Sequence, residues 1–181
     1  MTVFDPSSGL HVTAPDPDQH HRSAVLRDLG LDAESVPELD AIARALGEAA
    51  GQPWAMVNFI TDQQRFAGLF VAPGAPPVAR TMSREHGYCP DVLDRPVALI
   101  LPDVCSHPRF RSNQVVDRLG VRTYCGAPLI HNESGVTLGT VCFIGPEALP
   151  QETGQTNRAL INATRDQVMG VIRARAAELP H

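Results

Sequence analysis

Apolar residues recur at helical spacing near both ends of the chain, and they form short runs between those ends. Helices are expected over residues 20–29, between Ser35 and Gly51, and over residues 155–178. In the second of these helices, four apolar residues at i, i+3, i+7 and i+10 form one stripe: Leu39, Ile42, Leu46 and Ala49. Ser35 and Glu38 have the spacing of a capping box at its start, and Gly51 supplies its stop.

The runs between the helices are short, apolar and bounded by turn residues, which is typical of strands. Strands are expected at 54–60, 64–70, 98–104, 122–131 and 136–144. Residues 132–135 have hairpin composition, whereas the Pro-rich stretch 71–78 is expected to be a loop because successive prolines remove ladder donors. A polar loop and a short helix precede the last hairpin. This order of elements predicts an α+β fold with a mainly antiparallel sheet and helices packed on its faces.

The chain is expected to form one domain that follows an N-terminal arm. Its 181 residues are enough for one substantial core. Residues 1–18 are rich in Pro, Asp and Ser and lack periodicity, so they are expected to be a flexible arm. No repeat or linker divides residues 19–178, which are therefore expected to be a single domain.

Composition and charge exclude several classes of function. The chain is 43% apolar, and no window approaches the roughly 18 consecutive apolar residues that a membrane span needs. The first residues lack the basic and apolar regions of a secretory signal, so a cytoplasmic location without membrane contact is expected. A net charge of −5 argues against a nucleic-acid partner. The chain has no Lys, which excludes Schiff-base and P-loop lysine chemistry.

Five short motifs stand out along the chain: residues 56–66, Gly87-Tyr88-Cys89-Pro90, Asp103 with His107-Pro108-Arg109-Phe110, Arg122-x-Tyr124-Cys125-Gly126-Ala127-Pro128-Leu129, and Gly139-Thr140-Val141-Cys142. Together they resemble the motifs of GAF domains, a family of small-molecule sensor modules related to PAS domains. The last two motifs are the most specific of the five. The resemblance covers nearly everything from residue 20 to residue 178.

The resemblance implies an architecture and a place for a ligand. GAF domains have a central antiparallel sheet of about six strands, with the terminal helices on one face and loops and short helices over a ligand pocket on the other. Carried over, the pocket is expected at residues 86–93, at 103–110 and at the strand around Tyr124. Members of the family bind cyclic nucleotides, bilins, haem, nitrate or amino-acid-like effectors, so the resemblance leaves the cofactor unknown. The Cys-His dipeptide of bilin attachment and the Asn-Lys-x-x-Phe run of cyclic-nucleotide binders are both missing, which argues against those two ligands.

The residues expected to bind a ligand lie in these segments and on the strands beside them: Trp54, Asn58, Tyr88, Cys89, Asp103, Phe110, Arg122 and Tyr124. Arg122 and Tyr124 are two apart on a predicted strand and therefore share a face. With Asn58 or Trp54 they would fix a small anion between aromatic walls. The alternative is that Arg122 pairs with Asp103 and that Tyr124 is a core residue.

The four cysteines admit a second class of function. Without a C-x-x-C pair they are expected to be reduced, with Cys125 and Cys142 buried in strands as small apolar residues. Cys89 precedes Pro90, so its sulfur would lie at a helix start, where its pKa would fall and a redox role would open. The alternative is a thiol that only fills space. Two His/Cys pairs also match the ligand count of a zinc site, although their spacing is not a recognised one: His86 with Cys89, and Cys105 with His107.

An enzyme of the same family is a further alternative. Free methionine-(R)-sulfoxide reductases are GAF proteins that use pocket cysteines, and Cys89 and Cys105 fall in roughly the corresponding segments. However, residues 105–110 read Cys-Ser-His-Pro-Arg-Phe where those enzymes carry a Gly-His-Ile-x-Cys-like run. The catalytic position is therefore not reproduced, and no catalytic residue or metal ligand is assigned.

These observations predict a stand-alone, non-catalytic, small-molecule-sensing GAF protein of bacterial signal transduction. A homodimer is expected, in which Ile161, Val168 and Val171 of the last helix either form the interface or only cover the sheet. The GAF resemblance takes up the ordered chain and leaves no output segment, so a kinase or a transcription regulator is the expected partner. A redox or metal sensor and the reductase-like enzyme are the alternatives.

Overall fold

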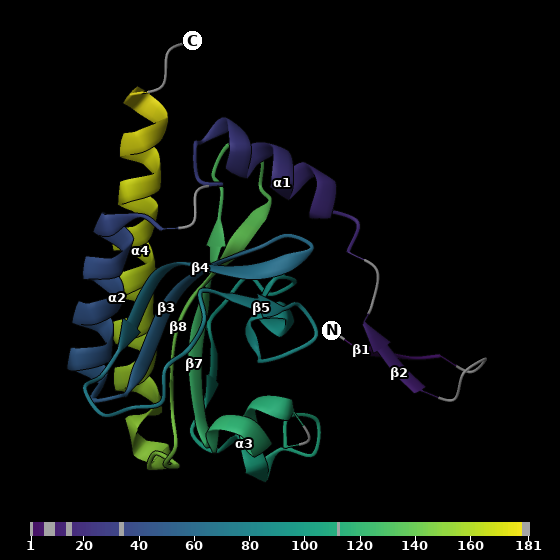
Figure 1. Ribbon diagram of the computed structural model, residues 1–181, viewed down its shortest axis with the longest axis vertical. Helices are drawn as coiled ribbons and strands as arrows, with labels where there is room; N and C mark the ends of the chain where they lie inside the picture. The colour runs from purple at the N-terminus through teal and green to yellow at the C-terminus, as the bar shows by residue number, and fades with distance from the viewer. Residues whose placement is uncertain (1, 6–9, 14–15, 33–34, 112, 179–181) are drawn as a thin grey trace.

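A six-stranded antiparallel sheet lies between a layer of helices and a layer of loops and short helices (Figure 1). The computed structural model describes residues 2–5, 10–13, 16–32, 35–111 and 113–178. The strands of the sheet are β3 (Trp54–Ile60), β4 (Gln63–Val71), β5 (Thr81–Ser83), β6 (Leu99–Leu101), β7 (Thr123–Ile130) and β8 (Thr137–Gly145). Their order in space is β5-β4-β3-β8-β7-β6, and every neighbouring pair is antiparallel. The predicted α+β architecture is confirmed.

The longer helices pack on one face of this sheet, and the short ones lie on the other. The longer helices are α1 (Gln19–Asp28), α2 (Pro37–Ala50) and α4 (Gly154–Glu178). The short ones are α3 (Gln114–Leu119) and the 3-10 helices η1 (Cys89–Val92) and η2 (Val104–Ser106), while η3 (Gln151–Thr153) leads into α4. In Figure 1, α2 and α4 stand side by side against the sheet and α3 lies beyond its other face. Among the described helices, none has the length and apolar content that a membrane span requires.

The pleat of the central strands divides their side chains between two apolar cores. Every residue of β3 is buried, which explains its nearly continuous apolar sequence. Ala55 and Val57 belong to the core under the helices, whereas Trp54 and Met56 belong to the core under the loops. This alternation follows because successive side chains of a strand point to opposite faces. The second core is therefore built from the alternate residues of the same strands.

The observed elements differ from the predicted ones at several boundaries. The capping box predicted at Ser35 is wrong: Val36 is the N-cap of α2, and Pro37 with its restricted φ occupies the first turn. β5 was not predicted, because its three residues follow a Pro-rich loop and show no alternation. β6 is shorter than the predicted strand at 98–104, because the chain leaves the sheet after Leu101 and enters η2.

Part of the predicted N-terminal arm forms a separate two-stranded sheet. β1 (Thr2–Asp5) and β2 (Leu10–Thr13) pair antiparallel and lie beside the main body in Figure 1. The rest of the arm before Asp16 lies outside the described residues. The flexibility of residues 1–18, and their boundary with a domain at 19–178, stay predictions.

Asp16 connects the segment before α1 to the sheet through two arginines. Its Oδ2 atom lies 2.5 Å from a guanidinium nitrogen of Arg22 and 2.5 Å from one of Arg84. Arg22 is 2% exposed and also donates to the carbonyl groups of Ile60 and Thr137. Burial raises the pKa of Asp16, but the hydrogen bonds and charges of the two arginines outweigh it and hold that pKa below its ordinary value. The carboxylate therefore balances the buried charge that holds α1 on the sheet.

Replacing Asp16 by Asn should lower the free energy of unfolding by about 3 kcal/mol, because it leaves buried guanidinium groups without their counter-charge. Urea denaturation of the full chain at neutral pH measures this loss. Since the pKa of Asp16 is lower in the folded state, its contribution is complete above the unfolded pKa of about 3.9 and is lost as pH falls through the folded value. The difference between the two proteins should therefore shrink in acid.

The matched control is Asp166→Asn, which removes a carboxylate that pairs with Arg165 and is 68% exposed. Because exposed ion pairs contribute little, this change should alter stability by less than about 0.5 kcal/mol. Equal losses for the two variants would contradict the role given to Asp16.

Candidate functional site

Two cysteines and a tyrosine meet on the loop-covered face of the sheet. Cys89 Sγ lies 3.5 Å from Cys142 Sγ, and the Tyr124 hydroxyl lies 3.6 Å from Cys89 Sγ. Cys142 Sγ also lies 3.9 Å from Met56 Sδ. The exposed fraction is 5% for Cys89 and 0% for Cys142. We call this group of four residues, Met56, Cys89, Tyr124 and Cys142, the thiol cluster.

Strand register and one glycine determine the geometry of the thiol cluster. Met56 and Cys142 are register partners on the adjacent strands β3 and β8. Tyr124 extends from β7 along its own strand over Gly126, where a Cβ atom would collide with the tyrosine hydroxyl. The missing side chain at Gly126 therefore allows the hydroxyl of Tyr124 to reach Cys89.

Polar contacts hold the loop that leads into η1, and so to Cys89. Asn113, the N-cap of α3, accepts a hydrogen bond from the Gly87 N–H at 3.0 Å and donates one to the Gly87 carbonyl at 2.7 Å. Gln64 on β4 donates to the carbonyl groups of Ser83 and His86 at 2.8 and 2.6 Å. These bonds join β4, the segment after β5 and α3 into one frame above the sheet.

Hydrogen bonding makes one thiol of the cluster more acidic than the other. The hydrogen bond with Cys142 is the largest cause that lowers the pKa of Cys89 below the ordinary thiol value, and Tyr124 adds to it against the opposing effect of burial. The same bond, together with burial, raises the pKa of Cys142 well above its ordinary value. The pair therefore loses its first proton from Cys89 and retains the second on Cys142.

Two buried tyrosines form walls beside the cluster and remain protonated. Burial is the main cause that raises the pKa of both Tyr88 and Tyr124. The Tyr88 hydroxyl donates to the Phe110 carbonyl at 3.2 Å, and the two rings meet edge-on with their centroids 5.8 Å apart. The centroids of the two tyrosine rings are 5.3 Å apart. Both tyrosines thus act as neutral hydrogen-bond donors.

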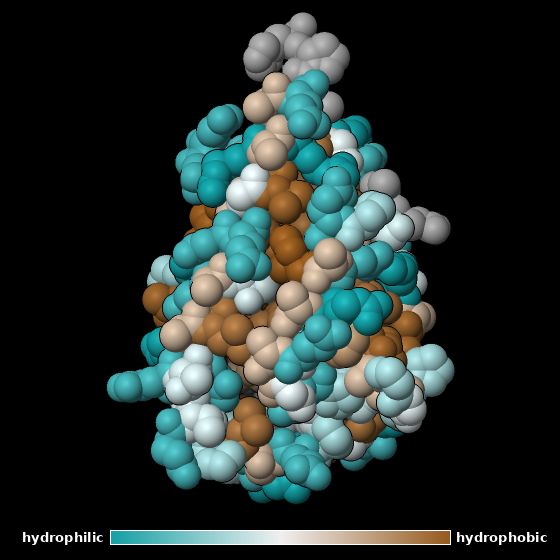
Figure 2. Space-filling model, turned by 90° about the vertical axis from the view of Figure 1, so that its left-hand side faces the viewer, coloured by the Kyte–Doolittle hydropathy of each residue, from teal (hydrophilic) through white to brown (hydrophobic). Residues whose placement is uncertain are grey.

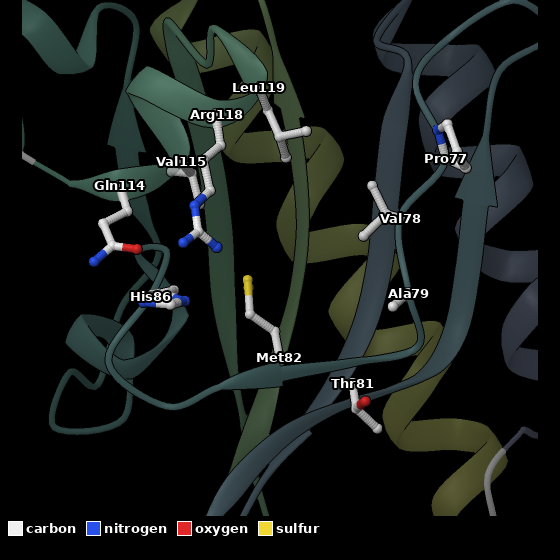
Figure 3. Close-up of a pocket in the computed structure, with 10 residues that line it drawn as sticks. All are labelled: Pro77, Val78, Ala79, Thr81, Met82, His86, Gln114, Val115, Arg118 and Leu119. Atoms are coloured by element: carbon white, nitrogen blue, oxygen red, sulfur yellow. The ribbon is translucent and has the colours of Figure 1, made fainter.

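Two adjoining hollows lie between this face of the sheet and the loops. The inner chamber, of about 40 Å³, is lined by Met56, Phe66, Val78, Met82, Gly87, Tyr88, Cys89, Val115, Leu119, Tyr124, Cys142 and Ile144. The outer pocket, of about 190 Å³, is lined by Pro77, Val78, Ala79, Thr81, Met82, His86, Gln114, Val115, Arg118 and Leu119 (Figure 3). Four apolar side chains line both hollows, and we call them the partition because they lie where the two hollows adjoin: Val78, Met82, Val115 and Leu119.

The outer pocket combines this apolar partition with a polar side. Gln114 and Arg118 project from α3, and His86 comes from the segment after β5. Figure 3 shows the Arg118 guanidinium extending toward Met82, with Gln114 and His86 to one side of it. Within the described part of the chain, no ion pair or side-chain hydrogen bond engages Arg118. Its charge therefore lies at the pocket, and no described carboxylate pairs with it.

Three of the predicted ligand-binding residues line the inner chamber: Tyr88, Cys89 and Tyr124. Trp54 and Phe110 belong to the surrounding core but line neither hollow, and the Trp54 indole donates to a loop carbonyl at 3.0 Å. Asn58 is fully buried and donates to the Gln64 side chain at 2.9 Å. These three residues support the walls of the hollows and do not form their surface.

Arg122 and Asp103, the remaining two predicted residues, lie outside both hollows. The Arg122 guanidinium donates to Asp103 at 2.9 and 3.1 Å, and its side chain is 43% exposed. This hydrogen bond lowers the pKa of Asp103 and raises the pKa of Arg122. The structure thus contains the Arg122–Asp103 ion pair, which was the alternative to a ligand-binding role for Arg122. Arg122 does not join Tyr124 at a common hollow.

The other cysteines do not join the thiol cluster. Cys125 is fully buried, as predicted, but belongs to the core under the helices. Cys105 lies in η2 and lines neither hollow. Across the described residues, no three or more His, Cys, Asp and Glu side chains are arranged to hold a metal ion. The zinc site considered for His86, Cys89, Cys105 and His107 is therefore not assembled in the described structure.

Two features of the site were not predicted from the sequence. Cys142 was expected only to fill the core, because its partner Cys89 is 53 residues away and no spacing rule connects them. Arg118 and Gln114 were not considered, although their i, i+4 spacing before Gly120 places them on one face of a short helix. That spacing was the available signal.

Replacing Gly126 by Ala should lower the free energy of unfolding by about 1–3 kcal/mol, because the new methyl group collides with the Tyr124 hydroxyl in a packed core. Urea denaturation measures the loss, and near-ultraviolet circular dichroism reports the altered tyrosine environment. The control is Gly154→Ala at the start of α4, where a Cβ meets no atom within 4 Å. The control should be neutral or slightly stabilising, and a loss equal to that of Gly126→Ala would refute the close approach.

Comparison with known proteins agrees with this architecture. The GAF domain family model matches residues 37–172. No curated protein sequence matches the chain. The similar solved structures include a free methionine-R-sulfoxide reductase from Neisseria meningitidis in complex with its substrate, with a TM-score of 0.62 and 18% identity over 94% of this chain and 98% of that one.

Two further solved structures have TM-scores of 0.57 at 12% identity. One is a type II free methionine-R-sulfoxide reductase from Thermoplasma acidophilum, matched over 76% of this chain and 92% of that one. The other is the GAF domain of an Acinetobacter phosphoenolpyruvate-protein phosphotransferase, matched over 91% and 98%. At these identities the likeness shows the fold alone. The family match spans most of the chain, and we conclude that the chain belongs to the GAF domain family.

Proposed function

We propose that this GAF domain is a non-catalytic sensor of a small molecule and that the outer pocket is its ligand site. The observation that supports this most directly is the Arg118 guanidinium, which has no partner among the described residues and lies over a pocket of about 190 Å³ with an apolar partition. Pockets for drug-sized ligands have roughly 300–1,000 Å³, so the volume favours a smaller molecule. The expected role is cytoplasmic signal transduction in a bacterium.

The lining of the outer pocket favours a small carboxylate with a short apolar body. A guanidinium recognises a carboxylate through two parallel hydrogen bonds, and Arg118 has no competing partner among the described residues. Val78, Met82 and Leu119 offer apolar surface for the rest of such a molecule. The Gln114 amide would pair with an additional hydroxyl or amino group.

Ligand binding would act through the position of α3. Arg118 and Gln114 belong to α3, and Asn113 at its start holds Gly87 through two hydrogen bonds. A carboxylate that binds better to one position of α3 would shift the population toward that position. The movement would then reach the segment before η1 through Asn113.

A reductase-like enzyme is less well supported than a sensor. Cys89 contacts Cys142, whereas Cys105 lies outside both hollows, so a reaction that uses Cys89 and Cys105 would first have to bring them together. The likeness to two methionine-R-sulfoxide reductases reflects a shared fold at 18% and 12% identity. Neither observation favours catalysis at this pair.

Replacing Arg118 by Gln should raise the Kd of a bound carboxylate by about tenfold to a hundredfold, because it removes a charge-assisted hydrogen-bond donor. The probes are short-chain aliphatic and α-amino carboxylates, titrated into the full chain and followed by NMR. Arg122→Gln is the matched control, since Arg122 pairs with Asp103 outside the pocket, and it should change Kd by less than about twofold. The proposed ligand class is wrong if no probe shifts resonances of α3, or if both variants weaken binding equally.

We also propose that the protein is a homodimer that acts on a kinase or a transcription regulator. Figure 2 shows the outer face of the helical layer, where apolar side chains lie in strips between polar ones. Ile161 and Val168 are fully buried and only cover the sheet, whereas Ile42, Leu160 and Val171 are partly buried. Among the residues considered from the sequence, Val171 is therefore the one available for an interface.

Sedimentation equilibrium of the full chain should show twice the monomer mass. Val171→Arg should shift the equilibrium to monomer because it places a charge at a partly buried apolar position of α4. Arg173→Ala, a change at an exposed position of the same helix, should leave the dimer intact. A monomeric parent protein at all concentrations would remove the dimer from the proposal.

A further inference from the structure

The inner chamber places two closely spaced thiols beside a space that is too small for most organic molecules. Cys89 and Cys142 have their sulfur atoms 3.5 Å apart and both line the chamber. About 40 Å³ of space holds on the order of three water-sized molecules. The two thiols come from different layers of the fold, η1 and β8, so the loop layer covers them from the solvent.

We propose that Cys89 and Cys142 are a site of oxidation by hydrogen peroxide, in which Cys89 is oxidised first and Cys142 then closes an intramolecular disulfide with it. The observations that support this site do not rest on ligand binding in the outer pocket. It uses a cysteine pair that differs from the Cys89 and Cys105 pair considered from the sequence.

The chemistry balances with hydrogen peroxide as the oxidant. The Cys89 sulfur attacks one peroxide oxygen, the O–O bond breaks, and the leaving hydroxide takes the former Cys89 proton to become water. The product is a sulfenic acid on Cys89. The Cys142 sulfur then attacks the Cys89 sulfur, the S–O bond breaks, and the hydroxyl leaves as a second water with the Cys142 proton. Two thiols are oxidised to one disulfide, and one peroxide is reduced to two waters.

The surroundings of the pair supply polar groups for so small a polar oxidant. The Tyr124 hydroxyl lies 3.6 Å from Cys89 Sγ and is positioned to donate a hydrogen bond at that sulfur. One register pair along the same face, the buried side chains of Asn58 and Thr140 bring further polar groups to Cys89 and, together with Cys142 and Tyr124, lower the pKa of that thiol.

The partition between the hollows should favour small oxidants over large ones at Cys89. A molecule that comes from the outer pocket must pass Val78, Met82, Val115 and Leu119 before it meets Cys89. Hydrogen peroxide is little larger than water, whereas an aromatic hydroperoxide exceeds the chamber. Cys105 is only partly buried and lies outside both hollows, so it provides an internal reference for unselective oxidation.

The test exposes the reduced full chain to limiting hydrogen peroxide and maps its peptides by mass spectrometry without reduction. A peptide that contains Cys89 should be linked to one that contains Cys142, and dithiothreitol should release the link. In Cys142→Ser, whose fold is checked by circular dichroism, Cys89 should instead accumulate a sulfenic acid that dimedone traps. Cys105→Ala is the control and should form the same link as the parent protein.

A second measurement compares oxidants and needs no variant. With cumene hydroperoxide, oxidation of Cys89 relative to Cys105 should fall by at least about tenfold because of its size. The proposal is overturned if Cys89 and Cys142 stay reduced while Cys105 is fully oxidised, or if Cys89 links to Cys105 instead. Equal relative oxidation by the two peroxides would overturn the selection by size.

Discussion

The burial of the central strands on both faces is the constraint on which the rest of this structure depends. β3, β7 and β8 have no solvent-facing side, so each of their side chains must enter one of two cores. The pleat makes that choice residue by residue. It puts Cys125 under the helices and Cys142 under the loops, although both are fully buried in neighbouring strands. The chemistry of the two thiols differs because their faces differ.

Both layers pack on the sheet through apolar residues, and polar bonds add to that packing in each of them. In the helical layer these bonds are those of Asp16 with its two arginines. In the loop layer they join separate segments, notably Asn113 with Gly87, and Gln64 with Ser83 and His86. The polar bonds of the loop layer therefore determine how its segments are arranged around the two hollows.

The two hollows differ in volume, and this difference separates the two roles proposed for the loop-covered face of the sheet. The outer pocket offers about 190 Å³ and a charged donor, whereas the inner chamber offers about 40 Å³ and a pair of thiols. Two of the four side chains of the partition, Val115 and Leu119, belong to α3. A change in the position of that helix would therefore alter both spaces. Ligand occupancy and thiol access are thus geometrically connected while their chemistries remain distinct.

Much of the fold follows from local pattern. The predicted strand at 54–60 coincides with β3, and the hairpin around residues 132–135 joins β7 and β8 within one residue of the predicted bounds. These elements were predictable because two-sided burial requires unbroken apolar runs and hairpins require turn residues. β5 and the start of α2 were not, because pairing with β4 and the geometry of Pro37 determine them.

The sequence by itself determined the family, the sheet and the segments that cover it, because these depend on periodicity and on motifs within short stretches. Only the tertiary structure decided which side chains meet. Arg122 pairs with Asp103 outside both hollows, Arg118 lines the outer pocket, and Cys89 contacts Cys142. Contacts of this kind join residues from separate segments, and their distances depend on strand register and loop closure, which no local pattern records.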